Sequence, residues 1–115
     1  MMYWVNKAFQ VYLRLQMPRI KRFMNKPIKT QNEVLKRLIQ KARYTKWGKQ
    51  YNYSSIKTPQ QFAEQVPIGD YETHKPYINR MMHGEADILW PGKIRWYSKS
   101  SGTTNDKSKY IPVSP

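Results

Sequence analysis

Apolar side chains near the start of the chain recur at spacings of three and four residues, which is the period of one helix face. The residues of this face are Trp4, Ala8, Val11, Tyr12 and Leu15. The pattern predicts a helix over residues 3–24. We expect Pro18 to kink or divide it, because proline has no backbone N–H to donate, and Pro27 to end it.

A second helix is predicted to begin at Thr30. Thr30 and Glu33 have the spacing of a capping box, in which each side chain binds the other residue's backbone N–H. Gly48 lies past the expected end of this helix, where a C-cap or turn is typical. The apolar stripe of the helix is Leu35, Leu38, Ile39 and Ala42.

A third, shorter helix is predicted after a loop over residues 52–57. Thr58 and Gln61 form a second capping box, Pro59 suits the first helical position, and Phe62 is the expected anchor. The segment 66–68 should be extended, because a residue before proline is pushed out of the α region.

A fourth helix is predicted to start at Asp70 or Thr73 and to be closed by Gly84. Pro76 is compatible only with the first turn of that helix. Its apolar face is Tyr77, Ile78, Met81 and Met82, a stripe more typical of a core than of a cofactor site.

The pattern changes after Asp87. The β-forming composition of residues 94–97 and 110–113 predicts two short strands, and a polar loop joins them. The predicted fold is therefore mainly α-helical with a short C-terminal β-hairpin. The helical region covers residues 1–85 and the strand–loop–strand covers residues 86–115, within one domain at most.

The composition excludes several kinds of site. There is no cysteine, so disulfides, thiolate catalysis and cysteine-bound zinc are excluded. His74 and His83 lack a partner at metal-ligand spacing, so no metal site is predicted. No apolar run reaches the length of a membrane span, and the N-terminus is a poor signal peptide. We therefore predict a cytoplasmic protein without a membrane span.

The net charge of +14 is concentrated in the first half of the chain. Residues 1–50 carry 13 Lys and Arg against one acid, and residues 51–115 carry 8 against 6, so the halves contribute +12 and +2. Such a half can bind nucleic acid or an anionic membrane, or it can be the solvated face of helices whose acidic partners lie elsewhere. The last interpretation is favoured, and any DNA binding should then be weak, unspecific and sensitive to salt.

The loop between the predicted strands has the residue types that bind a polyphosphate. It offers hydroxyls from Ser100, Ser101, Thr103 and Thr104. Gly102 permits positive φ, and consecutive N–H groups in such a turn can form an anion nest. Lys107 and Lys109 add positive charge. An exposed polar turn explains the same composition, and the Walker A spacing is absent.

The run from Ser100 to Thr104, followed by the two lysines, resembles the phosphate loop of adenylate-forming enzymes. With its upstream context it resembles the auxin-responsive acyl-acid amido synthetase family, in a bacterial type, over residues 18–114. The segments that carry this context are 45–49, 66–68, 70–72, 75–78, 80–81, 84–85, 89–91 and 96–99, together with Phe62.

That resemblance implies a carboxylate activation. Family members use ATP and magnesium to convert a small carboxylic acid into an acyl-adenylate, and an amine or amino acid then displaces AMP to form an amide. The residues implied to contact the ATP phosphates are Ser100, Ser101, Gly102, Thr103 and Thr104, with Lys107 and Lys109 as charge support. Asp106 departs from the plant-type loop, which often has glycine there.

It also implies that most of the active site lies elsewhere. In this family an α/β enzyme of several hundred residues carries the adenine pocket, acyl pocket, metal-binding acid and mobile C-terminal domain after the loop. We therefore expect this chain to be an N-terminal fragment with no catalytic residue of its own. Two other classes remain: a small basic nucleic-acid-binding module and an amphipathic membrane-surface protein using residues 1–24. Both explain the charge, and neither explains the loop.

Overall fold

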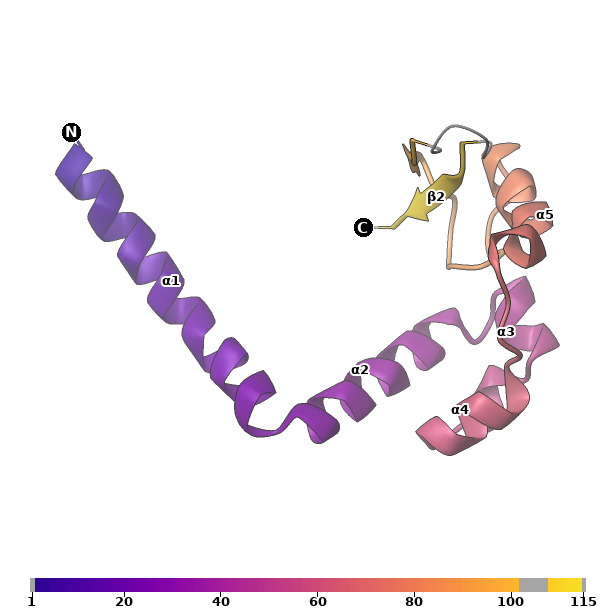
Figure 1. Ribbon diagram of the computed structural model, residues 1–115, viewed down its shortest axis with the longest axis horizontal. Helices are drawn as coiled ribbons and strands as arrows, with labels where there is room; N and C mark the ends of the chain where they lie inside the picture. Colours follow the sequence, from indigo (N-terminus) through magenta and orange to yellow (C-terminus); the bar gives the residue numbers. More distant parts are fainter. Residues whose placement is uncertain (1, 102–107, 115) are drawn as a thin grey trace. The chain divides into compact units, whose positions relative to one another are not determined.

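The computed structural model describes residues 2–101 and 108–114, and Figure 1 shows the order of the elements along the chain. The fold class predicted above, mainly helical with a C-terminal hairpin, is confirmed. The chain divides into two compact units, Met1–Leu35 and Lys36–Pro115. The helices are α1 (Met2–Asn25), α2 (Pro27–Ala42), α3 (Lys46–Gln50), η1 (Tyr53–Ser55), α4 (Pro59–Gln65) and α5 (Tyr71–Met82). The strands are β1 (Trp96–Lys99) and β2 (Tyr110–Val113).

Helix α1 is one uninterrupted helix of 24 residues with Pro18 inside it. Of the two outcomes expected at Pro18, a division of the helix is wrong, because the lost backbone bond is one among many in a long helix, and a kink stays a prediction. None of its residues is buried. An ion pair of 2.6 Å joins Arg22 to Glu33 inside α2. No helix in the described ranges has the length and apolarity needed to cross a membrane.

Helix α2 begins at Pro27, three residues before the predicted start. The capping box at Thr30 is wrong, because Thr30 is already inside the helix. Its backbone N–H donates to the Lys26 carbonyl at 3.0 Å, and its hydroxyl donates to the same oxygen at 2.9 Å. Proline at the first helical position needs no donor there, so Pro27 starts the helix earlier than the threonine signal suggested.

Helix α3 was not predicted, and Gly48 lies inside it rather than past a helix end. Thr45 restarts the helix: its hydroxyl oxygen accepts from the Gly48 N–H at 3.0 Å, and its O–H donates to the Ala42 carbonyl at 2.7 Å. A Cβ at Gly48 would lie 2.1 Å from the Ala42 oxygen. Gly48 therefore allows the backbones of α3 and the end of α2 to meet closely.

The first two amides of α3 bind the segment that leads to the hairpin. The N–H groups of Lys46 and Trp47 donate to the carbonyls of Asp87 and Ile88, at 2.8 and 3.0 Å. Asp87 has a φ of 56°, and its carboxylate accepts from the Gly92 N–H at 2.7 Å. These bonds satisfy the exposed donors of a helix start and fix the chain that enters β1.

Helices α4 and α5 have the caps that the sequence predicted. The Thr58–Gln61 capping box of α4 is confirmed, and Asp70 is the N-cap of α5. The expectation for Pro76 is wrong, because a start at Asp70 places Pro76 in the second turn of α5. Gly84 follows the helix end with a φ of 90°, as expected of the closing residue. The predicted loop over residues 52–57 contains the short helix η1.

The core of the second unit has two connected parts. The Trp47 ring packs on those of Tyr51, His74 and Tyr77, with centroids 4.6, 4.9 and 5.1 Å apart. A cluster of Met81, Ile88 and Ile94 lies next to Tyr77, Leu89, Trp90 and Tyr97. Tyr77 therefore belongs to both parts and links α3 to the hairpin.

The two strands pair antiparallel, with Trp96 opposite Val113 and Lys99 opposite Tyr110. β2 has the predicted bounds, whereas β1 is two residues nearer the loop than predicted. Successive side chains alternate between faces. One face carries Tyr97 towards the core, and the other leaves Trp96 76% and Ile111 52% exposed.

Candidate functional site

The base of the hairpin loop is closed by Ser100 and Lys109. The Ser100 N–H donates to the Lys109 carbonyl at 2.9 Å, and the Lys109 N–H donates to the Ser100 hydroxyl oxygen at 3.2 Å. The serine oxygen is thus an acceptor within the hairpin, while its proton stays available for an acceptor in the loop. The structure brings these two predicted site residues together.

The other predicted loop residues are placed only in part. Ser101 follows the hairpin base and is exposed. Gly102, Thr103, Thr104 and Lys107 lie outside the described residues, as does Asp106. Their part in the site therefore stays a prediction.

Two lysine side chains lie beside aromatic rings at the base of the loop. The Lys109 ammonium is 5.8 Å from the centre of the Tyr71 ring, and the Lys99 ammonium is 5.9 Å from that of Tyr110. Cation–π contacts of this length restrict where a lysine head can go. Sequence reasoning missed Lys99, although its position just before the loop was a signal for it.

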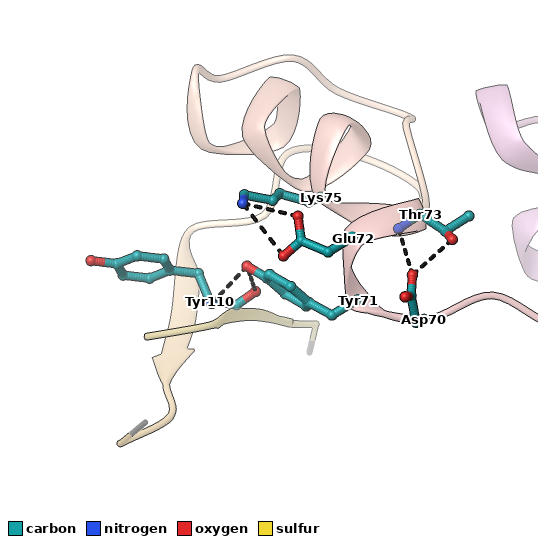
Figure 2. A network of polar contacts seen from close by, with 6 residues as sticks. All are labelled: Asp70, Tyr71, Glu72, Thr73, Lys75 and Tyr110. Carbon is teal, nitrogen blue, oxygen red and sulfur yellow. Dashed lines mark hydrogen bonds and ion pairs between the residues drawn. The ribbon is translucent and has the colours of Figure 1, made fainter. Parts of the chain in front are cut away.

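Tyr71 holds the start of β2 through its hydroxyl group, as Figure 2 shows. The backbone N–H of Tyr110 donates to the Tyr71 oxygen at 2.9 Å, and the Tyr71 hydroxyl faces the Tyr110 carbonyl at 3.4 Å. A side chain of α5 therefore supplies the hydrogen-bond partner that a further strand would otherwise supply. Nothing in the sequence pattern indicated this contact between residues 39 positions apart.

The first turn of α5 is fixed by polar contacts that position Tyr71. The Asp70 carboxylate accepts from the backbone N–H and from the hydroxyl of Thr73, both at 2.9 Å (Figure 2). These two bonds favour the ionised form and hold the Asp70 pKa below its ordinary value. Lys75 pairs with Glu72 at 3.1 Å on the same turn.

We expect Tyr71→Phe to loosen the hairpin without changing the helices. The substitution leaves the partly buried Tyr110 N–H without its acceptor, which costs about 1–2 kcal/mol. Hydrogen exchange should therefore quicken about tenfold at the Tyr110 amide. Tyr12→Phe, at an exposed position of α1, is the matched control and should leave that amide unchanged. Equal exchange in both variants would contradict the clamp.

Both histidines are bound to their own helix. The Nδ1 atom of His74 lies 2.7 Å from the Asp70 carbonyl, and that of His83 lies 2.7 Å from the Asn79 carbonyl. Within residues 2–101 and 108–114, no three His, Asp or Glu side chains are grouped so that they could hold a metal ion.

The chain resembles known proteins over most of its length. Residues 16–115 match the family profile described as the GH3 family N-terminal domain. A jasmonoyl–L-amino acid synthetase of Nicotiana attenuata is 34% identical over 85 residues, which are 73% of this chain and 15% of that protein. An indole-3-acetic acid–amido synthetase of Arabidopsis thaliana is 28% identical over 95 residues, which are 82% of this chain and 17% of that protein.

The relatives are much longer than this chain. A 4-substituted benzoates–glutamate ligase of Arabidopsis thaliana is 38% identical over 52 residues, which are 44% of this chain and 9% of the ligase. The chain thus spans less than a fifth of the length of each of these three relatives. No solved structure matches it.

Proposed function

Because this chain belongs to the GH3 family, by its match to the N-terminal domain of that family, we propose that it is the N-terminal part of an ATP-dependent acyl-acid amido synthetase. The whole enzyme would join a small carboxylic acid to an amine or amino acid. Support comes from the relatives, whose names describe synthetases and ligases of acids with amino acids. The observation that carries the proposal is the hairpin base, where Ser100 and Lys109 hold the two ends of the loop together.

In this proposal the loop holds the phosphates of ATP. Ser100, Ser101, Thr103 and Thr104 donate hydroxyl hydrogen bonds, and Gly102 lets the backbone approach the phosphate oxygens. Lys107 and Lys109 balance the negative charge. Hydrogen bonds to an ionised group are worth about 1.5–3 kcal/mol each, so several of them can place the α-phosphate and stabilise the charge that develops there.

The proposed reaction has two steps. A carboxylate oxygen of the acid attacks the α-phosphorus of ATP, and the bond to the β-phosphate oxygen breaks, which releases pyrophosphate. The amine nitrogen then attacks the acyl carbon, AMP leaves with the bonding electrons, and the nitrogen loses a proton to solvent. The loop's task is positioning and electrostatic stabilisation in the first step. Magnesium would assist the phosphates through ligands other than the described residues. We therefore assign the described residues no step that involves the metal.

The exposed face of the hairpin is an argument for a larger α/β fold around it. Trp96, Ile111 and Val113 share one face of the hairpin and are 76%, 52% and 44% exposed. A two-stranded hairpin is marginally stable in water unless more strands or a helix cover it. We infer that further chain of the whole enzyme covers this face.

The two outer edges of the hairpin differ. At β2, the Tyr110 backbone is already bound by Tyr71, and Pro112, two residues on, has no N–H to offer. In β1, Tyr97 is paired with Pro112 and Lys99 with Tyr110. The two backbones of such a pair both point away from the partner strand, so the backbone N–H and C=O groups of Tyr97 and Lys99 face outwards. In the described ranges no hydrogen bond occupies these outward groups. We therefore propose that the next strand of the enzyme pairs with β1.

The loop assignment is tested in the whole enzyme by the double variant Ser101→Ala, Thr103→Ala. Losing two hydroxyl donors to phosphate should lower acid-dependent pyrophosphate release from ATP by at least about tenfold. The matched control is Ser54→Ala with Thr58→Ser, which changes two hydroxyl residues away from the loop while keeping the α4 cap. An unchanged rate in the loop variant would remove the loop from the mechanism. If the intact enzyme showed no activity with any acid and amine of a substrate panel, the proposed reaction class would be rejected.

A further inference from the structure

Helix α1 carries an unusual number of exposed apolar side chains. We define the apolar face of α1 by Trp4, Val5, Phe9, Val11, Tyr12 and Leu15, which are between 56% and 73% exposed. Most amphipathic helices gain their stability by packing such a face against other groups. A face with three aromatic and three other large side chains exposed therefore indicates a binding surface.

The polar positions of the same segment lie on one narrow side. Lys7, Gln10 and Arg14 are separated by three, four and seven residues, so they stack along the helix, and Asn6 lies four residues before Gln10. Lys21 continues the row seven residues after Arg14. Residues 2–15 thus combine a broad apolar side with a basic stripe, and the Lys7 ammonium lies 5.0 Å from the Tyr3 ring beside it.

The charge of this unit restricts what can cover the helix. Residues 2–32 contain seven Lys and Arg and no Asp or Glu, and Glu33 is paired with Arg22. Two copies of α1 packed face to face would bring like charges together without a compensating acid. An anionic surface avoids that repulsion, because it attracts the basic residues.

The extent of the family match further restricts what can cover the apolar face of α1. The family profile starts at residue 16, so residues 2–15 are outside the part that this chain shares with the profile. A cover that needs no shaped partner, such as lipid headgroups and acyl chains, fits a segment of this kind.

We propose that residues 2–15 of α1 bind an anionic lipid surface. The helix lies along the interface, with its apolar face among the outer acyl chains and the basic stripe at the headgroups. Trp4 and Tyr12 suit this depth, because their rings have an apolar body and a polar edge. Lys7 and Arg14 contact phosphate, and Lys21 extends the charged side. The surface is independent of the loop and of the proposed enzyme activity.

The experiment is co-sedimentation of the chain with vesicles of phosphatidylcholine, with and without phosphatidylglycerol. Binding should be at least about tenfold tighter to the anionic vesicles and should weaken as salt rises. Lys7→Glu with Arg14→Glu, and separately Trp4→Ser with Phe9→Ser, should each lower the affinity at least about tenfold. The first pair tests the stripe and the second tests the apolar face.

The matched control is Lys93→Glu with Arg95→Glu, two exposed positions of the other unit. Both charge-reversal pairs change the net charge from +14 to +10, so bulk charge cannot distinguish them. The control should keep full vesicle binding. An equal loss in both pairs would overturn the proposal, because binding would then follow net charge alone. Circular dichroism confirms that each variant keeps its helices.

Two other occupants give different results. If α1 binds a second copy of the chain, light scattering finds a dimer that Trp4→Ser with Phe9→Ser dissociates, and vesicles bind no better with phosphatidylglycerol. If the basic stripe serves nucleic acid, the chain binds double-stranded DNA more tightly than anionic vesicles, and Trp4→Ser with Phe9→Ser lowers neither affinity. Either result overturns the lipid proposal.

Discussion

Alone, this chain is expected to release pyrophosphate from ATP at least about 10⁴-fold more slowly than a full-length relative, with any carboxylic acid. The loop is held by a hairpin of two four-residue strands, one face of which is largely exposed. Donors that must reorganise when charge develops lose most of their catalytic effect. The chain can still attract nucleotide phosphate weakly through its lysines.

The second reason for this expectation is geometric. The described residues provide no group of acids for a metal, and the proposed acid and amine sites belong to the rest of the enzyme. Without them the carboxylate is not held near the α-phosphorus, and orientation alone accounts for roughly 7–11 kcal/mol of many barriers.

The measurement is pyrophosphate release with a panel of carboxylic acids, for this chain and for a full-length relative at equal concentration. Nucleotide binding is followed in parallel, so that a misfolded sample is recognised. A comparable rate for the short chain would show that it contains a complete active site and would reject its assignment as a fragment.

Gly48→Ala should destabilise the second unit by about 2 kcal/mol. The new Cβ would stand 2.1 Å from the Ala42 carbonyl oxygen, and both groups belong to backbone that cannot rotate away. Overpacking of this kind costs about 3 kcal/mol, and the better helix propensity of alanine returns only about 1 kcal/mol. The clash therefore dominates, and α3 has to move away from the end of α2.

The measurement is urea unfolding, followed by the fluorescence of the buried Trp47. Gly84→Ala is the matched control, because Gly84 has a φ of 90° but no atom within 4 Å of the added Cβ. It should cost about 1 kcal/mol from backbone strain alone. If Gly48→Ala cost no more than Gly84→Ala, the close approach of α3 and α2 would not be an important constraint.

The capping signals illustrate what could be predicted from the sequence. At Thr58 the threonine, the proline after it and Gln61 all agreed on one helix start, and the structure has that start. At Thr30 the threonine and Glu33 were contradicted by Pro27, which also starts helices. Local patterns succeed where neighbouring signals agree, and a competing signal three residues away is enough to shift a boundary.

Contacts between distant segments were the part that the sequence could not provide. The loop residues were found because Ser100 to Thr104 form a contiguous motif. The Tyr71 clamp was missed because its partner is a backbone group of Tyr110, which has no residue type to recognise. The same holds for α3, whose first amides bind carbonyls of residues 87 and 88. Backbone partners leave no trace in a residue pattern.

The unequal edges of the hairpin also limit how copies of this chain can aggregate. A hairpin with two open edges can add further copies on both sides, which is how fibrils grow. Here Tyr71 and Pro112 close the β2 side, so only β1 can accept a strand from another copy. Two chains that meet through β1 complete a four-stranded sheet and leave no open edge. Misassembly through the hairpin therefore stops at a pair.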